Sequence, residues 1–136
     1  MKQKTKLSKH SKLPIAKLKK KAWDTFSIYV RQKGMDEQGM NECYTCRKQY
    51  HWKVLQAGHF IPRTHNATFI DEMNVKPQCF ADNIWKRGAS HEFSSRLIEE
   101  YGLEAFNALI AKGRTIKKFS PSELEALIEK YKLSPN

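Results

Sequence analysis

Residues 43–86 decide the fold, and three motifs within them carry the chemistry: CYTC at 43–46, GHFIP at 58–62 and DEMNVKPQCFADN at 71–83. The first motif places two cysteines three positions apart. The second holds one histidine in an apolar run typical of a strand, and the third holds an asparagine, a third cysteine and another asparagine. Each motif is a weak signal alone, whereas their order and spacing indicate one small site.

Cys43 and Cys46 have the spacing of a zinc knuckle, because two thiolates on a tight turn can both reach a zinc ion at about 2.3 Å. The chain has three cysteines. An odd count argues against a disulfide framework and for a metal site in a reducing cytoplasm. The same spacing occurs in redox motifs, but no thioredoxin-like βαβ pattern surrounds it here.

Positive charge gathers at the start of the chain. The net charge is +11, and residues 1–21 contain nine lysines and no acidic residue. Residues 22–91 carry nine basic and seven acidic residues, and residues 92–136 carry seven of each. A basic arm on a nearly neutral domain is typical of proteins that bind polyanions by releasing counterions from phosphates. A solubilising tail is the alternative, and a ribosomal or RNA-binding protein would show the same charge. The candidate nucleic-acid-binding residues are Lys17, Lys19, Lys20, Lys21, Arg63, Lys86 and Arg87.

A chain of 136 residues suits one domain with a modest core. Residues 1–13 have little to bury and are predicted to be a disordered basic arm, with residues 14–136 forming a single domain. No run of about 18 apolar residues predicts a membrane span. No apolar segment follows the N-terminal lysines, as a secretory signal would require. We therefore expect a cytoplasmic protein without a membrane partner.

The fold class predicted is α+β, with one small β-hairpin and four or five helices. Helical spacing of apolar residues predicts helices over residues 14–33, 90–101, 103–112 and 121–132, and another is expected to start near Asp82 or Asn83. Residues 50–55 and 57–62 are predicted to pair as a hairpin around Gln56, and residues 34–42 to form a loop. The expected inward residues of the helices are Ile15, Leu18, Ala22, Phe26, Tyr29, Phe93, Leu97, Ile98, Tyr101, Phe106, Leu109, Ile110, Leu124, Leu127, Ile128 and Tyr131. Trp23 is interpreted as a packing residue rather than a base-stacking one.

Hydrolysis of a phosphodiester needs a base for water, a divalent ion on the scissile phosphate and a rigid site. His59 can be the base at neutral pH, since a histidine titrates near pH 6.5. Asn83 can offer an oxygen to a hard cation such as magnesium, and the amide of Asn74 can brace the segment that bears His59. The alternative for each is ordinary: a lone histidine is usually structural or exposed, and asparagines are common in turns and caps. The other histidines are expected to be bystanders, namely His51, His65 and His91.

The assembled pattern resembles the HNH endonuclease superfamily: C-x-x-C, then GHFIPR, then D-E-x-N-V-x-P-Q-C with an asparagine four residues after the last cysteine. More narrowly, residues 40–112 resemble the phage lambda NinG (Rap) recombination-protein family, whose members pair GHF with N-V-x-x-Q-C-x-x-C-N. The resemblance implies a ββα-metal core with a zinc knuckle and added N- and C-terminal helices. It also implies metal-dependent cleavage of DNA, often of branched recombination intermediates, by a phage or prophage protein in a bacterial host cell. By the same resemblance His59 is the general base, Asn74 the central asparagine and Asn83 the position that binds catalytic Mg²⁺ or Mn²⁺.

This sequence departs from the family pattern in its second knuckle, where Asp82 stands in place of the second cysteine. A carboxylate oxygen can bind zinc at about 2.0–2.2 Å. We therefore expect Cys43, Cys46, Cys79 and Asp82 to hold a structural Zn²⁺. A weaker zinc site, or none, is the alternative.

A second departure lies directly before the histidine. Many HNH enzymes have an aspartate or histidine there as a metal ligand, whereas this chain has Gly58, as in the NinG pattern. Asn83 is then the one evident ligand of the catalytic ion. His65, Asp71 and water are the open alternatives for the remaining positions.

Three functions follow from these observations. The leading hypothesis is a DNA endonuclease of a phage or prophage, acting on branched or single-stranded-containing DNA. The second is a non-catalytic zinc-knuckle protein that binds nucleic acid through its basic arm and first helix. The third is an HNH-derived protein inactivated by its altered knuckle, acting as an inhibitor or accessory factor. A homodimer is also left open, because cutting two strands would suggest two chains.

Overall fold

The chain adopts a mixed α+β fold, as predicted. The computed structural model describes residues 13–132, so the expected arm falls almost entirely outside the described residues. The helices are α2 (Ile15–Gln32), α3 (Ser90–Tyr101), α4 (Leu103–Gly113) and α5 (Pro121–Lys132), with a short 3₁₀ helix η1 (Asn66–Thr68) and a π-helical turn η2 (Ala81–Trp85). The strands are β1 (Met40–Glu42), β2 (Gln49–His51), β3 (Gln56–His59) and β4 (Val75–Gln78). No helix within residues 13–132 is long and apolar enough to cross a membrane.

The strands form two antiparallel hairpins, and the predicted pairing of residues 50–55 with 57–62 is wrong. β1 pairs with β2, so a strand lies inside the predicted loop 34–42. β3 pairs with β4, with Gln56 opposite Gln78 and His59 opposite Val75. Residues 51–55 instead form a turn, because the amides of Val54 and Leu55 bond the carbonyls three residues before them. The strand pattern located β3, but its partner lies beyond a loop whose length the pattern does not reveal.

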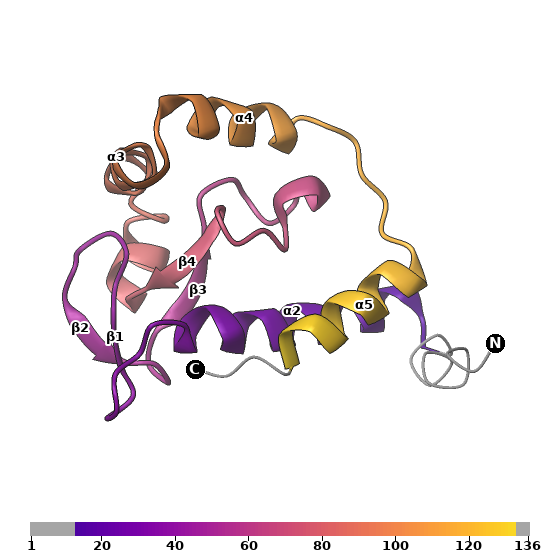
Figure 1. The fold of residues 1–136 in the computed structure, drawn as a ribbon, viewed down its shortest axis with the longest axis horizontal. Helices are drawn as coiled ribbons and strands as arrows, with labels where there is room; N and C mark the ends of the chain where they lie inside the picture. Colours follow the sequence, from indigo (N-terminus) through magenta and orange to yellow (C-terminus); the bar gives the residue numbers. More distant parts are fainter. Residues whose placement is uncertain (1–12, 133–136) are drawn as a thin grey trace.

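Three layers build the domain (Figure 1). Helices α2 and α5 lie side by side, the β3–β4 hairpin lies between them and the other two helices, and α3 and α4 cover the opposite side. Leu18, Ala22, Leu124 and Ile128 join α2 to α5 in a buried cluster. A second cluster, formed by Phe26, Val30, Val75 and Tyr131, joins both helices to β4. These residues recur at helical spacing, so one stripe of each helix faces the core.

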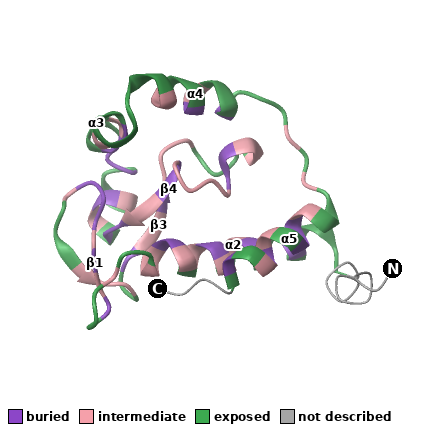
Figure 2. Cartoon of the chain, in the orientation of Figure 1, coloured by how far each residue is buried: buried purple, intermediate pink, exposed green. Residues whose placement is uncertain are grey.

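The far side of the hairpin packs against α3 and α4. Its buried cluster contains Tyr44, Phe93, Leu97 and Leu109, and Figure 2 shows the buried segments turned toward the interior of the domain. The cluster also receives side chains from the segment after β3, including Phe60 and Ile61. The segment that follows His59 is therefore anchored in a hydrophobic core.

Three residues predicted to face inward are exposed: Ile15, Ile98 and Tyr101. Ile15 lies in the first turn of α2, one turn before the Leu18 stripe that meets α5. Ile98 follows Leu97 and so lies off the stripe formed by Phe93 and Leu97. Tyr101 ends α3, and its hydroxyl accepts a hydrogen bond from the Lys76 ammonium at 2.6 Å.

The predicted start of the last helix is confirmed by its cap. The Ser120 hydroxyl accepts a hydrogen bond from the backbone N–H of Glu123 at 3.2 Å, as in a capping box. The Glu123 carboxylate does not return to the cap, because it forms an ion pair with Lys117.

Candidate metal centre and candidate active site

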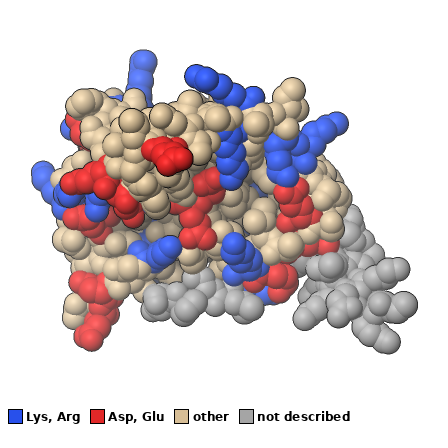
Figure 3. Space-filling view, turned by 45° about the horizontal axis from the view of Figure 1, so that its top comes forward, with Lys and Arg blue, Asp and Glu red and all other residues tan. Residues whose placement is uncertain are grey.

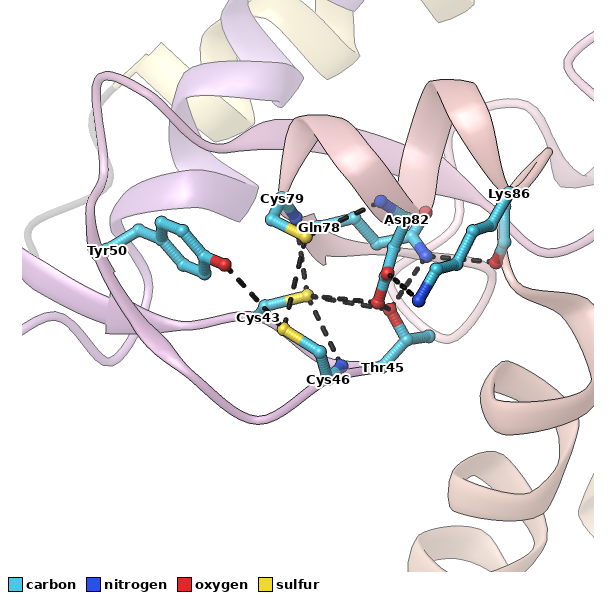
Figure 4. A network of polar contacts seen from close by, with 9 residues as sticks. Cys43, Thr45, Cys46, Tyr50, Gln78, Cys79, Asp82 and Lys86 are labelled. Carbon is cyan, nitrogen blue, oxygen red and sulfur yellow. Dashed lines mark hydrogen bonds and ion pairs between the residues drawn. The ribbon is translucent and has the colours of Figure 1, made fainter.

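The four predicted zinc ligands lie together at one end of the β3–β4 hairpin (Figure 4). Cys43 and Cys46 come from the turn between β1 and β2, Cys79 directly follows β4, and Asp82 lies in η2. Their ligand atoms all lie within 4.8 Å of one another. The Sγ atoms of Cys46 and Cys79 are 3.9 Å apart, close to the roughly 3.8 Å between sulfurs in a tetrahedron with Zn–S bonds of about 2.3 Å. These four residues can bind a metal such as zinc.

Backbone amides surround the sulfurs of the knuckle. The amides of Cys46 and Cys79 point at Cys43 Sγ at 3.5 and 3.3 Å, and the amide of Asp82 points at Cys79 Sγ at 3.5 Å. Burial raises the pKa of the Cys43 thiol, but its contacts with the Thr45 side chain and with the backbone amides of Cys46 and Cys79 outweigh burial and hold its pKa below the usual value. The turn therefore favours a thiolate, the form that binds metal.

Asp82 occupies the fourth position as a buried carboxylate that is 3% exposed. The Thr45 hydroxyl donates to Asp82 Oδ2 at 2.6 Å, and the Lys86 ammonium lies 3.5 Å from Asp82 Oδ1. Cys43 Sγ is 3.8 Å from Oδ2. Partners that hold a ligating carboxylate in this way are typical of metal sites, so Asp82 fits the role of the missing cysteine.

His59 ends β3 at the other end of the hairpin, beside two aromatic rings that also contact each other. Its ring stacks on Trp23 and Phe69, with centroid distances of 4.8 and 5.6 Å. Its Nε2 lies 3.0 Å from the Phe69 carbonyl oxygen. A carbonyl only accepts hydrogen bonds, so Nε2 carries the proton and Nδ1 keeps a free lone pair. Burial lowers the pKa of His59 to about 4, the Phe69 carbonyl opposes that shift, and nearby Arg63 adds to it.

Asn74 is fully buried. Its side chain joins the segment that directly follows His59 to the short helix η1. Its Oδ1 accepts from the Ile61 N–H at 2.7 Å, and its Nδ2 donates to the carbonyls of Ile61 and Thr68 at 3.0 and 2.9 Å. The Phe60 N–H also donates to the Asn74 carbonyl at 2.9 Å. Two residues that directly follow His59 are thus fixed by this one asparagine.

Asn83 lies in η2 and faces the opposite side of β3 from His59. Its Nδ2 donates to Gln56 Oε1 at 2.6 Å. Its Oδ1 lies 3.0 Å from the point where a Cβ on Gly58 would stand. Because side chains alternate across a strand, Gly58 and Gln56 share the face that Asn83 covers, and His59 points to the face that α2 covers.

A groove of about 410 Å³ is lined by Asn83 and by Trp23, one of the rings that contact His59, whereas His59 itself is not among its lining residues. Trp23, Gln56 and Asn83 are among its lining residues, together with Arg31, Lys53 and Arg63. The described lining contains these three basic side chains and no acidic one. The sequence analysis missed Arg31 and Lys53, because only the fold brings them beside Asn83.

The two side chains left open as further ligands of a catalytic ion are engaged elsewhere. His65 Nδ1 lies 3.0 Å from the Gly113 carbonyl. Asp71 accepts from the amides of Met73 and Asn74 and forms an ion pair with Lys112 at 2.6 Å. His65 and Asp71 therefore contact α4 and the turn before β4. Of the three candidates for the remaining ligands of the catalytic ion, water is the one without such contacts.

The predicted nucleic-acid-binding residues come from three segments of the chain. Lys17, Lys20 and Lys21 are exposed on α2 beside the half-buried Lys19, which donates to Asn66 Oδ1 at 2.7 Å. Lys20 pairs with Asp24. Arg63 lies over the rings of Trp23 and Phe69 at 5.3 and 5.4 Å, and Lys86 and Arg87 follow η2. Basic and acidic side chains are interspersed over the face shown in Figure 3, so that face carries no continuous basic surface.

The remaining predictions about side chains concern Trp23 and the other histidines. Trp23 packs against Phe26 as well as His59 and Phe69, which agrees with a packing role. His51 Nδ1 accepts from the Lys53 amide at 3.2 Å, and His91 is exposed at the start of α3.

Comparison with known proteins identifies the family. The family model described as "Bacteriophage Lambda NinG protein" matches residues 1–134. The chain belongs to the NinG family. A search of curated proteins and a search of solved structures each found no match. The NinG assignment covers the knuckle, His59 and both asparagines, and it identifies a phage-type protein without assigning a role to any residue.

Proposed function

We propose that this NinG-family protein is a metal-dependent DNA endonuclease of the HNH type. It would act in phage recombination on branched or single-stranded-containing DNA. The order of elements carries the proposal: β3, a loop, β4 and the helical turn η2 bring His59, Asn74 and Asn83 around one hairpin. The proposal assigns His59 the role of base, Asn74 the role of fixing the segment behind it, and Asn83 the role of offering an oxygen to a cation. Because His59 and Asn83 face opposite sides of β3, DNA would have to cross the hairpin to contact both.

The tautomer of His59, rather than its basicity, supports the role of general base. A pKa lowered to about 4 keeps the ring neutral at pH 7, and the bond from Nε2 to Phe69 leaves the Nδ1 lone pair to take a proton from water. A ring with so low a pKa is a weak base in the free protein. An approaching phosphate raises that pKa, because negative charge favours the imidazolium form.

The surroundings of Gly58 fit a hard divalent cation such as Mg²⁺ or Mn²⁺. Asn83 Oδ1 lies 3.0 Å from the point where a Cβ on Gly58 would stand, and amide oxygens are ligands that such cations accept. When bound, the cation supplies positive charge to the scissile phosphate and the leaving oxygen. Asn83 would hold it, and the Gln56 oxygen keeps the Asn83 amide oriented.

Two surface features support DNA with unpaired bases as the substrate. The groove beside Asn83 is lined by Arg31, Lys53 and Arg63, which suits a phosphate backbone.

The second feature is a set of three exposed apolar residues that lie close to Asn83 in the sequence, on and beside η2. Phe80, Ile84 and Trp85 are 47%, 48% and 76% exposed, and the sequence continues with Lys86 and Arg87. Aromatic side chains next to basic ones stack on the faces of unpaired bases.

A non-catalytic zinc-knuckle DNA-binding protein is the second candidate. One observation favours it: within residues 13–132 the knuckle is the one group of three or more His, Cys, Asp or Glu side chains placed to hold a metal. A cation beside Asn83 would thus rely on amide oxygens, water and DNA. In this second function the basic residues bind DNA and the His59 site is structural.

Cleavage of labelled DNAs separates the two functions. Linear duplex, single strand, fork and four-way junction would be incubated with wild type, His59→Ala and His91→Ala, each with Mg²⁺, Mn²⁺ or EDTA. The nuclease predicts metal-dependent cutting by wild type and by the exposed-histidine control His91→Ala, and a loss of about 10²–10⁴-fold in His59→Ala. Tight binding without cutting in any metal would favour the second candidate. Paired cuts that depend on protein concentration would indicate two cooperating chains.

A further inference from the structure

Gly58 is required by space rather than by backbone conformation. Its φ is not among the positive values of the chain. A Cβ built on it would lie 1.8 Å from Gln78 Oε1, 2.7 Å from Gln78 Cδ and 3.0 Å from Asn83 Oδ1. The place that a side chain at residue 58 would take is therefore filled by Gln78. Two amide oxygens, one from β4 and one from η2, meet at that place.

Gln78 is fully buried, and its orientation is fixed by its own amide nitrogen. Nε2 donates to the Gly88 carbonyl at 2.9 Å and to the Thr45 hydroxyl at 3.0 Å. Because a carbonyl can only accept, the nitrogen must stand on that side and Oε1 must face Gly58. Oε1 is one of two buried side-chain polar atoms without a hydrogen-bond partner in residues 13–132. A buried oxygen without a partner is unfavourable, so it calls for a ligand.

We propose that Gln78 Oε1 is a ligand of the divalent cation at Asn83, and that it replaces the side chain absent at Gly58. This inference rests on the proposed nuclease function and adds a residue that the family resemblance does not assign. Two neutral amide oxygens suit a hard cation such as Mg²⁺ or Mn²⁺. They bind it more weakly than carboxylates do, and Gln78 is buried, so water and DNA phosphates would complete the coordination from the groove that Asn83 lines. The cation is then bound most tightly when DNA is present.

The same glutamine links this site to the knuckle (Figure 4). The Thr45 hydroxyl accepts from Gln78 Nε2 and donates to Asp82 Oδ2. A metal bound by Asp82 and the cysteines would hold the Asp82 carboxylate in place, and with it the Thr45 hydroxyl. The Thr45 hydroxyl in turn orients the Gln78 amide, so that Oε1 faces Gly58. The knuckle acts as a support that positions a ligand of the second metal.

Manganese binding tests the assignment without relying on cleavage. Zinc-loaded full-length protein would be titrated with Mn²⁺, with and without a non-hydrolysable phosphorothioate junction, and free Mn²⁺ would be followed by its electron paramagnetic resonance signal. Gln78→Ala and Asn83→Ala should each weaken Mn²⁺ binding by at least about tenfold. The control Gln49→Ala, an exposed glutamine on β2, should bind as wild type does. Zinc content and thermal melting verify that each variant is folded.

Two further variants keep the test decisive if Gln78→Ala is too unstable. Gly58→Ala retains Gln78 but displaces its oxygen, so it should weaken Mn²⁺ binding while zinc stays bound. Gly58→Asp combined with Gln78→Ala places a carboxylate in the vacated space, and it should bind Mn²⁺ more tightly than wild type.

The outcomes distinguish this inference from the proposed function. Wild-type Mn²⁺ affinity in folded Gln78→Ala and Gly58→Ala would overturn the role of Gln78, even if the protein cuts DNA. Mn²⁺ binding that depends on Gln78, in a protein that cuts none of the DNAs, would support the ligand and overturn the nuclease. Absence of Mn²⁺ binding by wild type, with or without the junction, would overturn the ligand as well.

Discussion

The knuckle and the His59 site lie at opposite ends of the β3–β4 hairpin, and they differ in how complete they are. The knuckle offers four ligand atoms within 4.8 Å of one another, a number that a closed structural zinc site requires. The other region holds His59, the base of the proposed function, at the far end of β3. On the opposite face of β3, next to the knuckle, it holds the amide oxygens of Gln78 and Asn83 near Gly58. A closed set holds a metal unaided, whereas an open set leaves positions for water and substrate. We therefore expect the first region to determine folding and the second to determine chemistry.

The largest effect should follow loss of the knuckle metal. Cys79→Ser, or treatment of wild type with a strong chelator, should lower the free energy of unfolding by about 3 kcal/mol or more, since buried thiols and Asp82 lose their common partner. Zinc content by mass spectrometry and thermal melting measure this effect. His59→Ala is the control and should keep its zinc. An unchanged melting temperature after complete zinc removal would show that the knuckle does not determine folding.

Asn74→Ala should have the second largest effect on stability. It removes the contacts that join the segment directly after His59 to η1. Three backbone groups, on Ile61 and Thr68, would lose their buried side-chain partner. The expected loss is roughly 2–3 kcal/mol in the free energy of unfolding, with cleavage reduced further than stability explains. Chemical denaturation and cleavage rates measure the two losses, and zinc content should be unchanged. A variant that loses stability but keeps the full rate would assign Asn74 to the fold alone.

The contrast between the two regions also explains what the sequence revealed. Cys43 and Cys46 are fixed relative to each other by a three-residue spacing, which predicted the first half of the knuckle. Cys79 and Asp82 were added because they match the second knuckle of the family pattern, in which Asp82 replaces a cysteine. The helices were likewise predicted from local periodicity. The burial of single residues such as Ile98, which lies beside the buried stripe of α3, was not.

The pairing of β3 with β4 was not local, and so the sequence pattern assigned β3 the wrong partner. The roles of Gln78, Arg31 and Lys53 were missed for the same reason. A glutamine before a cysteine is an unremarkable residue until the fold places it against a glycine from another strand. Gly58 was recognised as a missing ligand, but only the geometry shows which side chain fills its space.

Acid sensitivity should reveal the burial of His59. Its folded pKa of about 4 lies below the ordinary value of 6.5, so the unfolded chain binds a proton more readily. Above about pH 6.5 the ring is neutral in both states, so His59 does not change the free energy of unfolding. That free energy falls as pH decreases from 6.5 toward 4. At pH 5 the expected loss is on the order of 2 kcal/mol. Melting temperatures between pH 4 and 7 should show a steeper fall for wild type than for His59→Gln. Parallel curves would mean that His59 titrates normally.

The smallest effect should come from single basic residues of the groove. Lys53→Ala should weaken DNA binding by a few-fold and reduce the dependence of log affinity on log salt concentration by about 1, as expected when one phosphate contact is lost. Lys130→Ala on the exposed face of α5 is the matched control and should leave that slope unchanged. Both variants should keep zinc and stability, because neither side chain takes part in a buried cluster. If both lower the slope equally, DNA contacts the surface without preference for the groove. A loss confined to Lys53 would place the phosphate backbone in the groove that Asn83 lines.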